Sequence, residues 1–251
     1  MDQQPTHEAV RRLAKDVRAL SGNSLAEHGI FYAHSESCIL NGEAIILGPP
    51  GTPYENGIYT FRLRFPLDYP HAPPKVTFIT QDQRGNMRFN PNLYRVGTVC
   101  LSILNTWQGP QWTGCQSISS VLLSIRTAVL NAEPLLNEPG VTRAHPDFKS
   151  YHKLLKFKNL ETAFFDTVSG KVGPASHILR DKIMEICSNN LEAVDNIIQD
   201  ELDMSSLKQS IRTDLYRIEG RVNYVRLRDW VRQFREQQGI KSNDTECMKL
   251  K

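Results

Sequence analysis

Apolar residues near the start of the chain recur with the period of a helix. Over residues 7–20 they fall at spacings of three and four, at Val10, Leu13, Val17 and Leu20. This spacing places them on one face of an amphipathic helix, for which Thr6 is the expected N-cap. The opposite face carries four basic side chains, Arg11, Arg12, Lys15 and Arg18. The pattern leaves two interpretations of that face open, a solvated surface and a basic docking surface.

The next part of the chain has the pattern of short β-strands. Four runs are apolar or alternate apolar with polar positions: residues 30–34, 44–47, 58–65 and 75–79. Alternation is typical of a strand with one buried face. Because turns rather than helices join these runs, they favour an antiparallel meander over parallel βαβ units. The connections at 48–57 and 65–76 hold three and four of the fourteen prolines, so we expect both to be rigid.

Helical patterns return in the second half of the chain. Residues 88–107 show little periodicity, but Ser117 or Ser119 could cap a helix over residues 121–129. A further helix is predicted over residues 148–168, where the apolar spacing is again helical.

The segment SGKVGP at 169–174 predicts a boundary, because it holds two glycines and a proline between helical patterns. Beyond it, two apolar stripes at helical spacing predict an all-helical region with a break at Gly220. The chain is therefore expected to divide into a core, residues 1–168, and an all-helical C-terminal extension, residues 175–251.

Charge is balanced over the whole chain but not along it. The 251 residues carry a formal net charge of +3, which makes no global case for nucleic-acid binding. Residues 191–203 are acidic without any Lys or Arg, whereas residues 212–235 hold seven Arg against three acidic residues. These blocks could pack together, be solvated, or form a docking module. Nucleic acid is a disfavoured alternative, because no RNA- or DNA-binding motif accompanies the arginines.

The cysteines and the apolar runs bear on location. No run reaches the length that a membrane span needs, and the polar start of the chain does not resemble a signal peptide. The five cysteines are Cys38, Cys100, Cys115, Cys187 and Cys247. An odd number at wide spacing favours free thiols in a reducing compartment, cytoplasmic or nuclear. With no CxxC pair and scattered histidines, no metal site is predicted.

A series of short motifs follows the predicted elements over about residues 10–140. They are the basic first helix, GPPGTPYENG (48–57), FPLDYPHAPPKV (65–76), NPN (90–92), VCLSIL (99–104), Trp112 and SISSVLLSI (117–125). In this order and spacing they resemble the ubiquitin-conjugating enzymes. The pieces FNPNLYRVGTVCLSILNTW and LLNEPG are most similar to the Z-type members and to the conjugating domain of the giant inhibitor-of-apoptosis protein. The resemblance implies an α+β UBC fold: an N-terminal helix, a four-stranded antiparallel meander and C-terminal helices.

The resemblance also implies two-step acyl transfer. A thiol takes ubiquitin, or a ubiquitin-like protein, from an activating enzyme as a thioester, and a substrate lysine then attacks it. Cys100 within VCLSIL matches the nucleophile, and a thiol suits this chemistry. A buried inert cysteine is the alternative, and Cys115 in the polar loop WTGCQ is the rival thiol. ATP is consumed by the activating enzyme, so no cofactor is expected here. The rival function is a non-catalytic ubiquitin-binding scaffold, whose known variants lack the nucleophile.

Asn92 matches the asparagine of the family's His-Pro-Asn motif. Its amide could stabilise the oxyanion of the tetrahedral intermediate, or it could only brace the loop by hydrogen bonds to the backbone. Pro91 completes the motif, and Asn90 replaces the usual histidine. We therefore expect no Cys–His pair, which excludes a simple cysteine-hydrolase site.

An attacking lysine is protonated at neutral pH and must be oriented or deprotonated. Glu133 matches an acidic position at the mouth of the family's site, although a solvated loop carboxylate is the alternative. The neighbouring acidic position is Ser102 here, in the same segment as Leu104, so the site carries less negative charge than in many relatives. Glu133 is therefore the main candidate for activating the lysine.

Two surfaces are implied for partner proteins. Arg11, Arg12 and Lys15 resemble the docking helix for the activating enzyme. The ligase-facing loops are expected at Pro66, His71, Trp112, Thr113 and Gly114. His71 replaces an exposed Phe of many relatives, and Thr113-Gly114-Cys115 replaces Ser-Pro-Ala, so standard pairing with RING ligases is disfavoured. The stretch NTWQGPQW (105–112) is expected to lengthen the loop beside Cys100.

Overall fold

A computed structural model describes residues 4–22, 24–82, 85–204 and 209–239. The predicted first helix is α1, His7–Leu20, and the Thr6 hydroxyl accepts a hydrogen bond from the Ala9 amide at 3.1 Å. The meander follows as β1 (Ile30–His34), β2 (Asn41–Leu47), β3 (Ile58–Arg64) and β4 (Lys75–Phe78). These strands form one antiparallel sheet in the order β1-β2-β3-β4, as predicted.

The helices of the core follow the sheet. They are α2 (Ile118–Ser124), which continues as the π-helical η3 (Ile125–Val129), and α3 (Phe148–Lys158), which continues as the π-helical η5 (Asn159–Asp166). Ser117 caps α2 in a capping box with Ser120, so the first of the two predicted caps is confirmed. Short 3₁₀ turns complete the core: η1 (Ala26–His28), η2 (Ser102–Leu104) and η4 (Pro134–Asn137).

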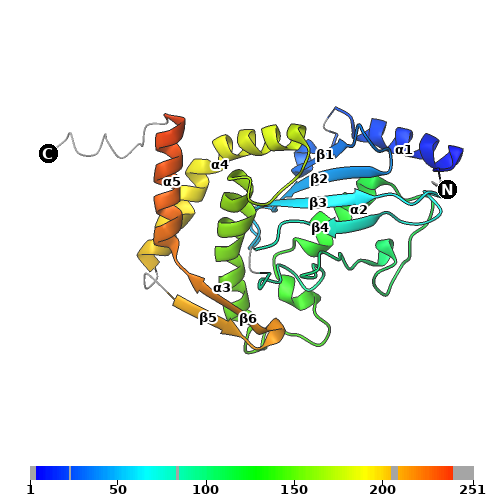
Figure 1. Ribbon diagram of the computed structural model, residues 1–251. Coiled ribbons are helices and arrows are strands. Elements are labelled where there is room, and N and C mark those ends of the chain that lie inside the picture. Colours follow the sequence, from blue (N-terminus) through cyan, green and yellow to red (C-terminus); the bar gives the residue numbers. More distant parts are fainter. Residues whose placement is uncertain (1–3, 23, 83–84, 205–208, 240–251) are drawn as a thin grey trace.

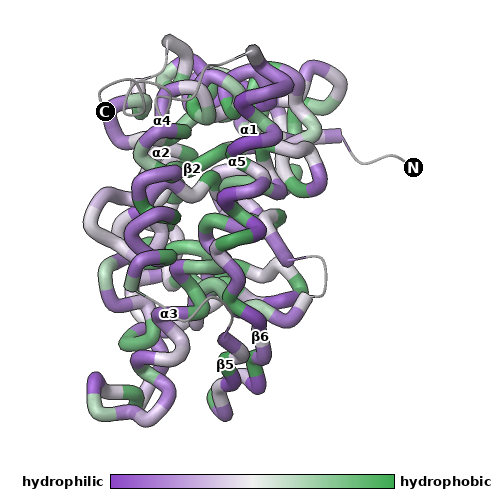
Figure 2. The backbone as a smooth tube through the Cα atoms, turned by 90° about the vertical axis from the view of Figure 1, so that its left-hand side faces the viewer, coloured by the Kyte–Doolittle hydropathy of each residue, from purple (hydrophilic) through white to green (hydrophobic). Residues whose placement is uncertain are grey.

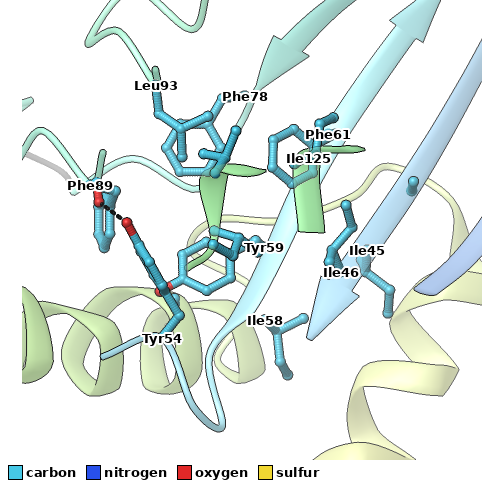
Figure 3. Packing of buried hydrophobic residues seen from close by; sticks show 14 of the residues in the cluster. Ile45, Ile46, Tyr54, Ile58, Tyr59, Phe61, Phe78, Phe89, Leu93 and Ile125 are labelled. Carbon is cyan, nitrogen blue, oxygen red and sulfur yellow. Dashed lines mark hydrogen bonds between the residues drawn. The ribbon is translucent and has the colours of Figure 1, made fainter. Parts of the chain in front are cut away.

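Aromatic side chains fill the space between the sheet and these helices. Tyr59 and Phe61 of β3 pack with Phe78 of β4 and with Phe89, all of them fully or almost fully buried (Figure 3). The Tyr54 hydroxyl donates to the Phe89 carbonyl oxygen at 2.8 Å. Burial on this scale is the main source of stability for such a core.

The C-terminal extension is largely helical but contains a hairpin. Its elements are α4 (His177–Met204), β5 (Gln209–Thr213), the 3₁₀ turn η6 (Leu215–Arg217), β6 (Ile218–Val222) and α5 (Tyr224–Gln238). The prediction of an all-helical extension is therefore wrong for 209–222, where β5 pairs antiparallel with β6. Figure 1 shows the hairpin beside α3, away from the four-stranded sheet.

Packing against α3 explains why a hairpin forms. Ile211, Ile218 and Val222 are buried, and their helical spacing is equally produced by two β-strands around a turn. Gly220 is a close-approach position rather than a helix break. A Cβ atom there would lie 2.6 Å from Cδ1 of Leu154 on α3, so the strand lies directly on the helix.

The extension is attached to the sheet and to itself by charged contacts. The Glu43 carboxylate on β2 accepts from the amides of Ala175 and Ser176, at 2.8 and 2.9 Å, just before α4 begins. Arg235 of α5 bonds Asp195 and Glu192 of α4, at 2.6 and 2.9 Å. The acidic and basic blocks thus pack together in part. The division of the chain into residues 1–168 and 175–251 stays a prediction.

Hydrophilic positions interrupt the hydrophobic ones along α4 and α5 (Figure 2). Accordingly, within the described ranges, no helix combines the length and the apolar character needed to cross a membrane.

Candidate active site

Cys100 ends a small irregular hairpin that begins at Asn90. Its amide donates to the Asn92 carbonyl oxygen at 2.8 Å. The hairpin turns at Gly97, whose φ of +88° favours glycine, and a Cβ there would lie 2.8 Å from Cγ2 of Thr77. The glycine lets the hairpin approach β4, so that the Phe78 amide donates to the Gly97 carbonyl oxygen at 2.7 Å. The sheet thereby fixes the backbone that carries Cys100.

The Cys100 thiol is covered by the loop that follows it. Cys100 is only 5% exposed, and its Sγ–H donates to the Thr106 carbonyl oxygen at 2.7 Å. The Thr106 hydroxyl holds the loop in place, because it donates to the Val99 carbonyl oxygen at 2.8 Å and accepts from the Leu101 amide at 2.9 Å. Burial raises the pKa of the Cys100 thiol, and hydrogen bonds with Tyr94 and Thr106 oppose that rise.

Asn92 braces Cys100 through its side chain. Its Nδ2 donates to the Cys100 carbonyl oxygen at 2.7 Å, and its Oδ1 accepts from Nδ2 of Asn137 at 2.8 Å. This geometry matches the loop-bracing alternative. The oxyanion role stays a prediction.

Asn90 begins the NPN turn, and its side chain braces that turn. It is fully buried. Its Nδ2 donates to the Tyr54 hydroxyl at 2.9 Å and to the Val129 carbonyl oxygen at 2.7 Å, and its Oδ1 accepts from the Asn92 amide at 2.7 Å. A carboxamide supplies both the donors and the acceptor for this network. Asn90 thus ties the turn to the core.

Glu133 is paired rather than simply solvated. Arg143 Nε donates to its Oε1 at 2.6 Å, and Arg143 Nη2 donates to its other oxygen. This bidentate hydrogen bonding lowers the pKa of Glu133 below its usual value. A carboxylate with a lowered pKa is a weak proton acceptor, so the geometry favours orientation of a lysine ammonium over its deprotonation. Either role of Glu133 stays a prediction.

The other motif residues lie in the segments before and after Cys100. Pro91 is buried, and its carbonyl oxygen accepts from Arg88 Nη2 at 2.6 Å. Leu104 is buried at the end of η2 and packs in the core, whereas Ser102 at its start is half-buried. A Cβ on Gly109 would lie 3.1 Å from Cβ of Ser102, so the 105–112 loop folds back onto this turn.

The predicted docking face of α1 is only partly free. Arg11 and Lys15 are exposed. Arg12 instead donates to Asp16 at 2.9 Å and to the carbonyl oxygens of Gly114 and Gln116. It therefore ties α1 to the loop after Trp112. A role for these three basic residues in docking stays a prediction.

The expected ligase-facing loops come together at Trp112. Its indole is buried, and Nε1 donates to the Pro70 carbonyl oxygen at 2.7 Å. Pro66 is half-buried in the facing loop, whereas Thr113 and Gly114 are exposed. His71 is exposed and lies 3.0 Å from the Glu8 carboxylate. The structure thus gathers residues from two separate motifs on one side of α1.

The remaining thiols lie elsewhere. Cys115 is exposed in the loop after Trp112, Cys38 is half-buried, and Cys187 is buried in α4. Burial raises the pKa of Cys187 to about 11, which makes it a poor nucleophile at neutral pH. Cys247 lies outside the described residues. Among those that are described, no three His, Cys, Asp or Glu side chains gather as metal ligands.

Sequence reasoning missed several residues that hold this site. Asn137 and Thr106 fall inside quoted motifs, but nothing in their type signals a contact with Asn92 or with the thiol. Arg88 and Tyr216 are far apart in the sequence, and only the fold brings them together. The Arg88 guanidinium lies over the Tyr216 ring, with its carbon 4.5 Å from the centre of that ring.

Comparison with known proteins bears on this site. Residues 12–159 match the family model described as ubiquitin-conjugating enzyme. The chain is 39% identical over 173 residues to Ubiquitin-conjugating enzyme E2 Z of Danio rerio, covering 68% of this chain and 52% of that protein. It is 47% identical over 130 residues to Ubiquitin-conjugating enzyme E2 Z of Homo sapiens, covering 51% and 36%. It is 43% identical over 141 residues to Dual E2 ubiquitin-conjugating enzyme/E3 ubiquitin-protein ligase BIRC6 of Homo sapiens, covering 53% and 3%. The chain thus spans about half, or less, of the length of these relatives.

Proposed function

The chain belongs to the ubiquitin-conjugating enzyme family, and on this premise we propose that it carries ubiquitin, or a ubiquitin-like protein, as a thioester on Cys100 and transfers it to lysine. The expected likeness to the Z-type members is confirmed, because relatives named Ubiquitin-conjugating enzyme E2 Z are 37–47% identical to it. The observation that carries the proposal is that two hydrogen bonds join Cys100 to Asn92. The Cys100 amide donates to the Asn92 carbonyl oxygen, and the Asn92 side chain donates to the Cys100 carbonyl oxygen.

The first step exchanges one thioester for another. The Cys100 thiol loses its proton, and the thiolate attacks the carbonyl carbon of the modifier's C-terminus. The thiol of the activating enzyme leaves with the electron pair and takes up a proton. The bond broken and the bond formed are both thioesters, so no oxidant or reductant is needed. We assign the preceding consumption of ATP to the activating enzyme.

The cover over the thiol must open for this step. With Cys100 only 5% exposed and its thiol bonded to the Thr106 carbonyl oxygen, Sγ is shielded from an incoming carbonyl carbon while that contact persists. The contact joins a thiol to a backbone carbonyl and is held by one threonine hydroxyl. We assign the opening to the loop of residues 105–112, which starts at that contact.

In the second step a lysine amine attacks the Cys100 thioester. An oxyanion forms at the carbonyl, then collapses and releases the Cys100 thiolate, and the lysine proton passes to solvent or to that thiolate. Asn92 carries two amide hydrogens, so one can keep the bond to the Cys100 carbonyl oxygen while the other meets the oxyanion. Glu133 is ionised and would attract the lysine ammonium rather than take its proton.

Partner proteins are part of the proposal. The exposed Arg11 and Lys15 of α1 suit an acidic surface of an activating enzyme. The loops around Trp112 suit a ligase, to which His71 would offer a polar imidazole in place of an apolar phenyl ring. Reducing compartments, cytoplasmic or nuclear, would keep Cys100 as a thiol.

A charging assay tests the proposal. The protein is mixed with activating enzyme, ATP and ubiquitin, and an adduct that reductant cleaves is expected. Cys100→Ser should give a reductant-resistant oxyester or no adduct. Cys38→Ser, which removes a thiol from the loop between β1 and β2, should form the thioester normally. A reductant-sensitive adduct on Cys100→Ser that disappears in the double variant with Cys115→Ser would assign the nucleophile to Cys115. Ubiquitin binding without any adduct would favour the scaffold.

A further inference from the structure

The C-terminal hairpin reaches the loop that carries Cys100. Its tip is η6, and the ring of Tyr216 there contacts the guanidinium of Arg88, with 4.5 Å between the ring centre and Cζ. Arg88 also contacts the ring of Tyr94, at 4.0 Å. We refer to these three side chains, Tyr94, Arg88 and Tyr216, as the Arg88 clamp. Contacts of this kind between a guanidinium and aromatic faces are attractive, the more so when shielded from water.

Tyr216 is held in place by the core rather than by its own hairpin. Its hydroxyl donates to the Glu138 carboxylate, and its carbonyl oxygen accepts from Arg95 Nη2 at 2.6 Å. The neighbouring Leu215 amide donates to the Asp147 carboxylate at 2.8 Å. The φ of Tyr216 is +63°, a conformation unfavourable for a bulky residue. The core contacts therefore maintain a conformation that the tip would not adopt freely.

Arg88 connects the clamp to the NPN turn. Its Nη2 donates to the Pro91 carbonyl oxygen at 2.6 Å. Pro91 stands between Asn90, which ties the turn to the core, and Asn92, which braces Cys100. Its backbone carbonyl oxygen accepts from the Tyr151 hydroxyl at 2.9 Å, so the chain on which Arg88 stands is fixed to α3. The guanidinium is thus held by the Pro91 carbonyl oxygen and by the two aromatic rings.

Two members of the clamp also act on the thiol itself. The Tyr94 side chain and the Arg88 charge both lower the pKa of Cys100, against the rise that burial causes. A guanidinium held beside a thiol favours the thiolate. Its effect depends on the guanidinium staying where the clamp holds it.

We propose that Tyr216 is a positioning residue of the transfer site: by clamping Arg88 against Tyr94, it fixes the turn that presents Cys100. The C-terminal extension thereby takes part in thioester chemistry and is more than an appended domain. This inference rests on the proposed function of Cys100. A purely structural role for Tyr216, as an anchor of the hairpin, is the alternative that the test must separate.

The test compares Tyr216→Ala with two variants. Tyr216→Phe keeps the ring on Arg88 and removes only the hydroxyl that bonds Glu138. Arg212→Ala is the matched control, because Arg212 lies on the same hairpin and pairs with Glu219, both side chains being mostly exposed. Circular dichroism and thermal unfolding report whether each variant keeps the fold.

The first measurement is the pH profile of Cys100 alkylation by iodoacetamide, followed by mass spectrometry of the Cys100 peptide. Only the thiolate reacts, so release of Arg88 in Tyr216→Ala shifts the profile to higher pH. Tyr216→Phe and Arg212→Ala keep the wild-type profile. The second measurement is thioester formation, where Tyr216→Ala lowers kcat by about tenfold, as expected for a misplaced nucleophile, and leaves KM for the charged activating enzyme unchanged.

The outcomes separate the possibilities. Wild-type kcat and an unshifted alkylation profile in folded Tyr216→Ala overturn the inference, as do equal losses in Arg212→Ala. If Tyr216→Ala does not fold, Arg88→Lys tests the clamp from the other side, since it keeps the charge but not the planar stack. Wild-type kcat in Arg88→Lys then overturns the inference. Failure of the wild-type protein to charge at all refutes the proposed function, while the alkylation profile still decides on the clamp.

Discussion

Asn92 and Cys100 are linked in both directions: the Cys100 amide donates to the Asn92 carbonyl oxygen at 2.8 Å, and the Asn92 side chain donates to the Cys100 carbonyl oxygen at 2.7 Å. The pair closes a small ring of backbone and side chain around the hairpin that ends at the thiol. A variant that removes the Asn92 carboxamide therefore changes the support of the Cys100 backbone as well as the donor available to an oxyanion. The bracing role and the oxyanion role of Asn92 can be separated by comparison with a variant of Asn137, a residue that braces Asn92.

Asn92→Ala is expected to slow lysine discharge of the thioester by about a hundredfold, the loss typical of one oxyanion donor. Asn137→Ala removes the 2.8 Å hydrogen bond to Asn92 Oδ1, together with the hydrogen bonds that Asn137 makes with Ala128 and Asn131. It is expected to slow discharge by less than about tenfold, because the donor remains. Single-turnover discharge to free lysine measures both rates. Equal losses in the two variants would mean that bracing accounts for the whole effect of Asn92.

Asn90→Ala is expected to lower the free energy of unfolding by about 2–4 kcal/mol, because it leaves buried partners without their hydrogen bonds. The Tyr54 hydroxyl and the Val129 carbonyl oxygen both lose a donor. Chemical denaturation measures the change. Asn86→Ala, an exposed substitution four residues earlier, serves as the control, and a loss no larger than in that control would contradict the bracing role.

The core could be predicted from the sequence because its patterns are local. The alternation in residues 58–65 and the spacing of Leu13 and Leu20 report which side of an element is buried, and the four strands and α1 follow from them. The motifs around Cys100 single out this cysteine as the candidate nucleophile for the same reason, since they form short contiguous stretches. Its cover could not be predicted, because the contact is made by the backbone carbonyl of Thr106, and a backbone atom has no residue-type signal.

The hairpin and the clamp depend on contacts between distant parts of the chain. The spacing of Ile211, Ile218 and Val222 fits a helix as well as two strands, and packing of Gly220 on α3 decides between them. Likewise, the sequence shows Tyr216 only as an aromatic residue in an arginine-rich block, and its contact with Arg88 is visible only in the fold. Periodicity describes an element's buried side but not what buries it.

Glu133→Gln is expected to slow lysine discharge without changing the shape of its pH profile above neutral pH. The Arg143 hydrogen bonds lower the pKa of Glu133, so its carboxylate is charged throughout that range and only its attraction for the ammonium is lost. The stabilisation from this pair is present above the usual glutamate pKa and is lost as pH falls through the lowered value. Discharge rates across pH measure the profile.

Arg143→Ala provides the converse change. It frees the Glu133 carboxylate and lets its pKa rise toward the usual value, so discharge near neutral pH should be maintained or faster. A strong loss of discharge in Arg143→Ala would mean that the pair itself, rather than the free carboxylate, orients the lysine.

Glu43→Gln is expected to weaken attachment of the extension. The Glu43 carboxylate accepts from two amides at the start of α4, where a negative charge is favoured by the helix dipole. The free energy of unfolding should fall by about 1 kcal/mol, as for loss of a helix cap. Hydrogen exchange of the 175–180 amides should rise at the same time. Glu36→Gln, an exposed residue of the nearby 35–38 loop, should change neither quantity.

Thr106→Val is expected to uncover the nucleophile. The variant keeps the shape of the side chain but removes the hydroxyl that donates to the Val99 carbonyl oxygen and accepts from the Leu101 amide, so the loop over the thiol loosens. Burial raises the pKa of Cys100 and the Thr106 hydrogen bond lowers it, so the variant acts on that pKa in both directions. The faster alkylation expected at a fixed neutral pH therefore follows from easier access to Sγ. The free energy of unfolding should fall by about 1–2 kcal/mol, for two hydrogen bonds.

The matched control for Thr106→Val is Thr127→Val. Thr127 is an exposed threonine of η3, and its hydroxyl donates to the Leu123 carbonyl oxygen at 2.9 Å. It removes a similar hydroxyl without touching the Cys100 loop, so alkylation of Cys100 should stay at the wild-type rate. Equal alkylation rates in folded Thr106→Val and wild-type protein would show that the hydroxyl does not hold the cover. The opening of the 105–112 loop would then need another cause. Conversely, faster thioester formation by Thr106→Val than by wild-type protein would show that this cover limits access to the thiol.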